Sequence, residues 1–465
     1  MALISENSVQ DSVINSPTGN VEGEKYPSSF RANYALIILM LAYIVSFVDR
    51  QILALLIEPM KADLHLTDLQ IGMVQGLAFA VFYTVLGIPI ARLADNHSRR
   101  VVISVGVLIW SAMTAACGLA KSFMTLFIAR MGVGVGEAAL SPSAFSMLSD
   151  YFPPEKLARA LSIYVLGGTI GAGLAYLLGG MVLDLVEHAE PMVLPFFGEL
   201  KVWQMAFIIV AIPGPILVLL FATVREPPRK ILRVSDADKN TDISSTDSIP
   251  FAQVVAYLLS KRKLYGYHFA TLTFLPIVGT GIMLWIPTFF IRTYDQTAIN
   301  VGYHYGLIYL IFGSLGTICG GFAAQALSKR YKDGNMRWVF IMAIVHPIPY
   351  ILTFLMPTYE LALMMSCLLT FVGSTYFGVS VAALQLVTPN RMRAQVSAIL
   401  LFFSNISGMA LGPLIIAFIT DFVYGNEMYL NYSIATFSAI FLPIGIWFSY
   451  HAMIHYGKAV ESLDL

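Results

Sequence analysis

The chain has 465 residues, of which 57% are hydrophobic and only 12% charged, and its mean hydropathy is +0.73. These values exclude an ordinary soluble protein and indicate that lipid surrounds most of the chain. Lys plus Arg equals Asp plus Glu at 28 each, and no basic stripe with interleaved aromatic residues is present. A nucleic-acid partner is therefore not expected.

The first 29 residues are polar and lack the basic, apolar and small-residue order of a signal peptide. We therefore expect residues 1–32 to form an N-terminal tail, with the first membrane helix acting as its own insertion signal.

Apolar runs of roughly 20 residues, long enough to cross a hydrocarbon core of about 30 Å, follow this tail. The sequence predicts six spans before a polar interval and six after it, at 33–57, 70–94, 100–120, 123–149, 157–186, 202–223, 264–291, 301–327, 336–356, 359–387, 392–420 and 429–454.

The distribution of Lys and Arg between the spans predicts their orientation. The even-numbered connections hold nineteen Lys and Arg residues, whereas the odd-numbered ones hold only Lys61, Lys121, Lys201 and Arg292. Because positive residues concentrate in cytoplasmic loops, we expect both termini in the cytoplasm of a multi-pass protein of the cell (inner) membrane.

The polar interval divides the chain into two parts. Residues 225–250 are rich in Ser, Asp, Thr and Lys and are expected to be a flexible linker. Residues 251–259 then place apolar side chains at helical spacing before Lys261, Arg262 and Lys263, which predicts a short amphipathic helix on an anionic leaflet. The predicted domains are a bundle at 33–223, a cytoplasmic linker at 224–262, a second bundle at 263–456 and a cytoplasmic tail at 457–465.

A weak internal repeat relates the two bundles. The segment PPEKLARALSI (153–163), before the fifth span, is similar to TPNRMRAQVSAI (388–399), before the eleventh. We predict an all-α membrane protein of twelve transmembrane helices in two six-helix bundles, with a substrate site between the bundles near the membrane midplane.

The connection after the second span, ARLADNHSRR (91–100), resembles the signature of the major facilitator family. Asp95, Arg99 and Arg100 keep the acidic and basic positions, whereas Ala91 and Ser98 replace glycines. Arg99 can pair with Asp95 or Asp150, and Asp95 can face the N-terminus of a helix from the other bundle. We interpret Asp95, Arg99, Arg100 and Asp150 as a cytoplasmic gate; the alternative is that these charges only set topology.

Four charged residues lie far from the ends of the predicted spans, all in the first half: Asp49, Arg50, Arg130 and Glu137. A charge near the bilayer centre costs roughly 2.5 kcal/mol or more, so such residues need partners and usually serve function. Depth along the helices favours pairing of Arg50 with Glu137. We predict that the four residues couple transport to proton movement and that Arg50 and Glu137 also contact substrate. The alternative is a permanent ion pair that only fixes packing.

Other residues carry less information. The three cysteines lie in apolar runs without metal-ligand spacing, so no metal site is expected, and the lone His304 and His346 are more typical of packing residues. Signatures such as HExxH, GxSxG and GxxxxGK[ST] are absent, which argues against an enzyme.

Four stretches of the first half resemble the Spinster group of the major facilitator superfamily, in a bacterial form: FVDRQ (47–51), RLADNHSRRVV (92–102), RMGVGVGEA (130–138) and SDYFPPEKLARALSIY (149–164). That group transports lipids such as lysophospholipids and sphingosine-1-phosphate. The resemblance implies that Asp49, Arg50 and Glu137 sense protons and contact a headgroup, and that Asp95 and Arg99 belong to a gate.

The expected activity is proton-coupled transport of an amphiphilic lipid by alternating access. Spans at 269–290 and 371–384 offer aromatic and aliphatic surface opposite the charged first half, which suits an amphiphile. An organic anion and proton symporter of the same superfamily is the alternative, and a non-transporting receptor or scaffold is a more distant one. We expect no cofactor beyond the proton gradient, membrane lipids and a small amphiphile as partners, and a monomer.

Overall fold

The computed structural model describes residues 26–188, 193–194, 198–229, 250–389 and 392–463, with the side chains of Asp95, Pro154, Glu155, Ala158 and Ala394 left aside. Within these residues, twelve helical segments are long and apolar enough to cross a membrane. The predicted number of spans is therefore confirmed.

The first half contains six spans, several of them built from consecutive helices. Its elements are α1 (Ser29–Leu55), α2 (Ile57–Leu64), α3 (Asp68–Gly72), η1 (Met73–Leu77), α4 (Ala78–Asn96), α5 (Arg99–Gly118), α6 (Phe123–Glu137), α7 (Leu140–Tyr151), α8 (Pro154–Glu187), α9 (Val202–Ala211) and α10 (Pro213–Thr223). A short antiparallel hairpin of β1 (Val193–Leu194) and β2 (Gly198–Glu199) lies between α8 and α9.

The second half repeats this arrangement after α11 (Phe251–Ser260). Its elements are α12 (Arg262–Tyr294), α13 (Ala298–Ile308), η3 (Tyr309–Gly313), α14 (Ser314–Ser328), α15 (Gly334–Val345), α16 (Pro347–Leu352), η4 (Thr353–Leu355), α17 (Tyr359–Ser374), α18 (Phe377–Val387), α19 (Arg393–Asn405), η6 (Ile406–Leu411), α20 (Gly412–Phe418), η7 (Ile419–Tyr424), η8 (Glu427–Tyr429) and α21 (Leu430–Leu463).

The second and eighth spans, which correspond to each other in the two halves, are interrupted in the same way. The second span contains the π-helical turn η1 between α3 and α4, and the eighth contains η3 between α13 and α14. A π-helical turn inserts one extra residue and commonly occurs where a helix serves function. The shared interruption is consistent with the internal repeat in the sequence.

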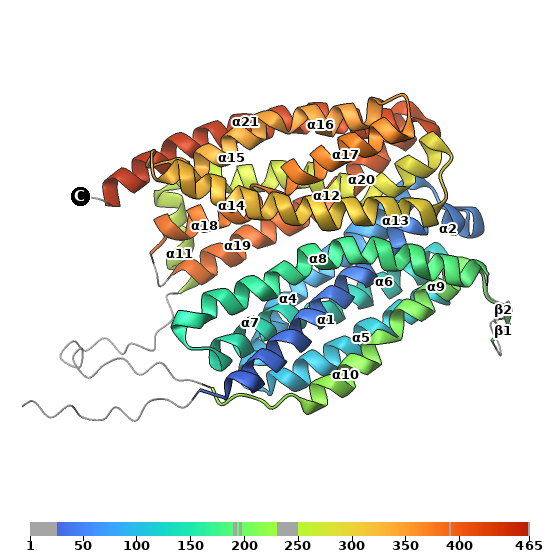
Figure 1. Ribbon diagram of the computed structural model, residues 1–465, viewed down its shortest axis with the longest axis horizontal. Helices are drawn as coiled ribbons and strands as arrows, with labels where there is room; N and C mark the ends of the chain where they lie inside the picture. Colours follow the sequence, from blue (N-terminus) through green and yellow to red (C-terminus); the bar gives the residue numbers. More distant parts are fainter. Residues whose placement is uncertain (1–25, 189–192, 195–197, 230–249, 390–391, 464–465) are drawn as a thin grey trace, which may run out of the picture.

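The two halves lie one above the other in Figure 1, blue to green below and yellow to red above. We name the two ends of this bundle after residues that lie there: the Arg292 end, near α2 and the β hairpin, and the Arg99 end, near α7 and α11. The most extensive contact between the halves is α8 with α13. Gly180 and Gly302 allow this approach, because a Cβ added at Gly302 would lie 2.9 Å from the Gly180 Cα.

Some helix ends differ from the predicted ranges by several residues. The last helix α21 continues to Leu463, so most of the predicted tail at 457–465 extends the twelfth span. The amphipathic segment at 251–259 forms α11, with Val254 buried and Phe251 and Leu259 exposed. Most of the linker that precedes it, and most of the N-terminal tail, lie outside the described residues.

Candidate functional site

The charged residues inside the first half form one buried cluster. Arg50 of α1 binds Glu137 of α6: its Nε donates to Glu137 Oε2 over 2.7 Å, and its Nη2 lies 2.5 Å from the same oxygen. The Glu137 side chain is 0% exposed, whereas that of Arg50 is 11% exposed. The pairing predicted from depth along the helices is therefore present, and Arg50 is its more accessible member.

Aromatic rings surround the guanidinium of Arg50. Its Cζ lies 5.2 Å from the ring centre of Phe47, 4.7 Å from Phe79 and 4.9 Å from Tyr83. Cation–π attraction stabilises a guanidinium at such distances, most strongly where water is excluded. The rings hold Arg50 in place without neutralising it, which leaves Glu137 as the carboxylate that compensates its charge.

The other two charged residues lie beside this pair. Asp49 is 1% exposed and accepts a hydrogen bond from the Thr114 hydroxyl of α5 (3.3 Å), and Arg130 Nη1 donates to the Asp49 backbone carbonyl (3.3 Å). Asp49 Oδ1, Glu137 Oε1 and Arg130 Nε are buried without a hydrogen-bond partner among the described residues. Buried polar atoms are normally paired, so these three atoms are candidates for binding a proton or a polar ligand group.

Glycines of α6 allow the cluster to be this compact. A Cβ added at Gly134 would lie 2.6 Å from the Phe79 carbonyl oxygen, and one at Gly136 would lie 2.5 Å from the Trp110 backbone nitrogen. Only a glycine lets α4 and α5 approach α6 so closely. The helix α6 also ends at Glu137, before α7 begins at Leu140.

The second half meets α1 directly beside Arg50. Gln51 Nε2 donates to the Met283 sulfur of α12 (3.7 Å), and the Tyr176 hydroxyl of α8 donates to the Met283 carbonyl (2.6 Å). The Tyr309 hydroxyl lies 3.8 Å from the same sulfur. Next to Gln51, the second half thus supplies the thioether and carbonyl groups of Met283 and the aromatic ring of Tyr309.

Of the predicted gating residues, Arg99 and Asp150 contact each other at the Arg99 end, within the first half. Arg99 Nη1 pairs with Asp150 Oδ2, and its Nε donates to Glu226 Oε1 over 2.8 Å. Glu226 also accepts from the Ser98 hydroxyl (2.8 Å) and the backbone N–H of Arg100 (2.9 Å). Arg99 therefore pairs with Asp150, one of its two predicted partners, while the Asp95 side chain lies outside the described part.

Glu226 was missed by the sequence reasoning, although it follows the sixth span directly. Its partial burial alone would raise the pKa of the carboxyl. The Arg100 backbone N–H, the Arg99 guanidinium and the Ser98 hydroxyl outweigh that effect and hold the pKa of Glu226 below its usual range. The signal available in the sequence was its position next to Arg225, within reach of the basic connection after the second span.

A second ionic cluster at the Arg292 end joins the two halves, and the sequence reasoning also missed it. Arg292 of α12 donates to both carboxylate oxygens of Asp68 (2.6 and 2.8 Å) and to Glu58 (2.8 Å). Lys61 Nζ lies 2.6 Å from Asp68 Oδ1 and also pairs with Glu427 of the second half. The sequence reasoning treated Lys61 and Arg292 only as markers of topology.

The two lone histidines have local partners. His346 is buried, with Nδ1 2.6 Å from the Met342 carbonyl, and His304 Nδ1 lies 2.8 Å from the Tyr359 hydroxyl. Neither contact reaches the Arg50 cluster.

The sequence matches the Major Facilitator Superfamily over residues 39–413. It is 27% identical over 402 residues to an MFS-type efflux pump of Mycolicibacterium smegmatis, with 84% of this chain and 85% of the pump covered. It is also 27% identical over 414 residues to Protein spinster homolog 1 of Xenopus tropicalis, covering 83% of this chain and 72% of that protein.

A solved structure shares the fold over most of the chain. The crystal structure of a bacterial homologue of the human lysosomal transporter Spinster, inward-facing and unoccupied, superposes with a TM-score of 0.76 at 26% identity. The match covers 94% of this chain and 98% of that one. These findings confirm the predicted resemblance to a bacterial Spinster-like protein.

Proposed function

Because the chain belongs to the major facilitator superfamily and is a Spinster-like transporter rather than an enzyme, we propose that it carries an amphiphilic lipid in exchange for, or together with, protons. The proposed substrates are lysophospholipids or sphingoid phosphates. The proposed energy source is the proton gradient, without a bound cofactor. The proposed location is the inner membrane, with both termini in the cytoplasm.

The observation that carries the proton coupling is the buried pair of Arg50 and Glu137 with a second carboxylate, Asp49, beside it. The carboxylates of Asp49 and Glu137 lie with the guanidinium groups of Arg50 and Arg130. Three of their atoms, Asp49 Oδ1, Glu137 Oε1 and Arg130 Nε, have no hydrogen-bond partner among the described residues. Separation of α1 from α6 would leave Glu137 buried without its cation, and a buried carboxylate then binds a proton. Protonation of Glu137 would in turn release Arg50 for an anionic group of the substrate.

The unequal chemistry of the two halves supports an amphiphile as substrate. The charged cluster lies in the first half, and Gln51, which follows Arg50 on α1, donates to the Met283 sulfur of the second half, where the Tyr309 hydroxyl also lies. An anionic headgroup suits Arg50, and an acyl chain suits thioether and aromatic surface.

Alternating access is supported by the uneven contact between the halves. Arg292 and Lys61 join the halves at one end, whereas Arg99 binds groups of its own half at the other. The positive-inside rule predicts that the Arg292 end lies on the outside of the membrane. In that orientation, the ion pairs between the halves close the protein toward the outside. Opening at the Arg292 end would then require these ion pairs to separate.

An organic anion and proton symporter remains the second candidate, because a buried Arg–Glu pair would also bind a small carboxylate. A binding panel separates the two. Purified protein is tested by thermal shift with lysophospholipids, sphingoid phosphates and small organic acids. Stabilisation by the lipids supports the proposal; stabilisation by the acids alone would overturn it.

A further inference from the structure

A second candidate site lies far from the Arg50 cluster, at the Arg99 end. A cavity of about 380 Å³ opens between the first turns of α1 and the beginning of α8, with residues 26–27 and 151–153 at its rim. Asn33 in this cavity lies 17 residues before Arg50 on α1, which is about 25 Å along the helix. The cavity is thus separate from the proposed transport site.

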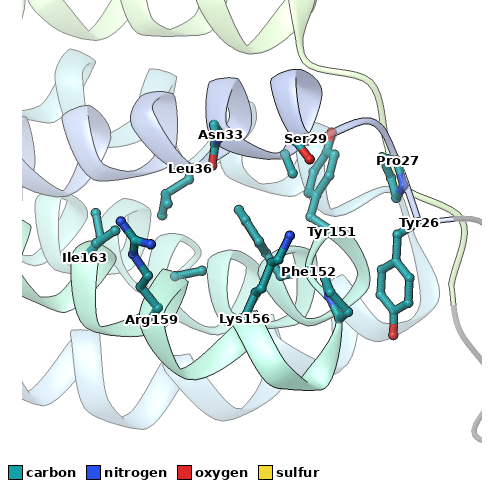
Figure 2. A pocket seen from close by; sticks show the side chains of 13 residues that line it. Tyr26, Pro27, Ser29, Asn33, Leu36, Tyr151, Phe152, Lys156, Arg159 and Ile163 are labelled. Carbon is teal, nitrogen blue, oxygen red and sulfur yellow. The ribbon is translucent and has the colours of Figure 1, made fainter.

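Two cations of α8 reach into this cavity. Figure 2 shows the side chains of Lys156 and Arg159 extending from α8 toward α1, where Ser29 and Asn33 line the opposite side. Lys156 and Arg159 are three residues apart and therefore share one face of the helix. They give the cavity a positive wall with hydroxyl and amide groups across from it.

Among the described residues, these two cations have no carboxylate partner, unlike three of the arginines of the protein. Arg50, Arg99 and Arg292 each pair with a carboxylate. Lys156 and Arg159 form no ion pair with any residue the structure describes, and no Asp or Glu is among the residues that line the cavity. An uncompensated pair of cations at a concave site attracts an anion.

The inner wall of the cavity is apolar. Ala32 and Ala160 are each 2% exposed, and Leu36 is 4% exposed, so the wall belongs to the packed contact between α1 and α8. Ile163 extends this apolar surface one turn further along α8. A positive rim above an apolar wall matches a molecule with an anionic head and a hydrocarbon part.

We propose that this cavity binds the phosphate group of an anionic amphiphile, with Lys156 and Arg159 as its cationic ligands and Ser29 and Asn33 as hydrogen-bonding groups. The hydrocarbon part lies against Leu36 and Ile163. The inference concerns a site distinct from the transport pathway and does not depend on the proposed transport function. Free phosphate shares the headgroup chemistry, so the test separates the two sources.

Full-length detergent-solubilised protein is titrated with short-chain phosphatidylglycerol, the matched phosphatidylcholine and inorganic phosphate, and binding is measured by native mass spectrometry and thermal shift. Wild-type protein is expected to bind phosphatidylglycerol in preference to phosphatidylcholine. A basic residue near an anionic lipid surface contributes about a fivefold effect, so K156Q/R159Q is expected to bind about 25-fold more weakly. If inorganic phosphate binds as tightly as phosphatidylglycerol, and K156Q/R159Q loses this binding, the phosphate site is supported with free phosphate as its ligand.

The matched control is K329Q/R330Q, which removes two exposed cations that follow α14 and do not line the cavity. It is expected to bind like wild type, and K156R/R159K is expected to retain binding within about threefold because both charges remain. Should K156Q/R159Q fail to fold, K156Q and R159Q singly are each expected to weaken binding about fivefold. Phosphatidylglycerol binding by these Gln variants within twofold of wild type would overturn the proposal.

Discussion

Arg50 and Glu137 are 87 residues apart in the chain, yet the Nη2 of one lies 2.5 Å from the Oε2 of the other inside the first half of the protein. Both depend on this contact, because a lone charge at this depth is costly. Three aromatic rings also surround the Arg50 guanidinium and help to hold it beside Glu137.

Replacing Arg50 by Lys tests whether this geometry matters beyond charge. Lysine cannot offer two N–H groups of one planar fork to Glu137, and it stacks less favourably among Phe47, Phe79 and Tyr83. Arg50→Lys is expected to fold but to transport about tenfold more slowly in proteoliposomes, equivalent to about 1.4 kcal/mol. Arg31→Lys, at an exposed position of the same helix, is the control. Equal initial rates for the two variants would contradict the assigned role.

Removing Arg292 is expected to open the end of the protein that it closes. Arg292→Met leaves the buried Asp68 with Lys61 alone, and breaking a buried pair commonly costs about 3 to 5 kcal/mol. Spin labels at Ala62 and Asn426, exposed positions on opposite halves, are expected to show a longer mean distance in this variant. Arg337→Met removes an Arg–Asp pair confined to the second half and is expected to leave the distance unchanged. An unchanged distance in Arg292→Met would show that the cluster does not hold the halves together.

The glycine contact between α8 and α13 gives a steric test of the same closed end. A side chain at Gly302 would meet the Tyr176 carbonyl oxygen at 2.8 Å and the Gly180 Cα at 2.9 Å. Overpacking of this kind costs about 1 to 3 kcal/mol, so Gly302→Val is expected to lower the melting temperature of the purified protein. Gly321→Val, where an added Cβ meets no atom within 4 Å, is expected to have a much smaller effect. A similar decrease in melting temperature in Gly302→Val and Gly321→Val would indicate general disruption of helices instead of a specific clash between α8 and α13.

Glu226 makes a pH-dependent contribution to stability at the Arg99 end. Its folded-state pKa is lowered, so the stabilisation is present above its unfolded pKa of about 4.3 and is lost as the pH falls through the folded value. Because it caps the first turn of α5, Glu226→Gln is expected to cost about 1 to 2 kcal/mol at pH 7. The difference from wild type should shrink toward pH 3, as measured by chemical denaturation across this range. If the difference in unfolding free energy between wild type and Glu226→Gln stays constant with pH, the ionised Glu226 carboxylate does not stabilise the start of α5.

Much of the fold could be predicted because the bilayer imposes a length and polarity on each span. The four buried charges were also visible in the sequence, since Asp49, Arg50, Arg130 and Glu137 interrupt otherwise apolar runs. The pairing of Arg50 with Glu137 followed from depth along two helices, whereas the contacts of Asp49 and Arg130 did not. In contrast, the Arg292 cluster combines residues from three connections, and only the folded arrangement brings Asp68, Lys61 and Glu427 to Arg292.

The charged residues at the Arg99 end show a different limit of prediction from the sequence. Arg99 was predicted to pair with Asp95 or Asp150, and the structure shows the pair with Asp150 together with Glu226. Sequence spacing alone could not identify Glu226, because its approach depends on where the chain turns after α10. The role of this set as a gate stays a prediction. The proton-coupling roles of Asp49, Arg50, Arg130 and Glu137, and the contact of Arg50 and Glu137 with substrate, also stay predictions.

The most direct test of the central claim is lipid flux in proteoliposomes under an imposed pH gradient. Wild-type protein is expected to accelerate uptake or release of a fluorescent lysophospholipid or sphingoid phosphate when the gradient is present. Glu137→Gln and Asp49→Asn are expected to lose this gradient dependence while remaining folded, with Gly321→Val as a control that keeps it. Flux that follows the pH gradient equally well in Glu137→Gln and Asp49→Asn would contradict proton coupling through this cluster.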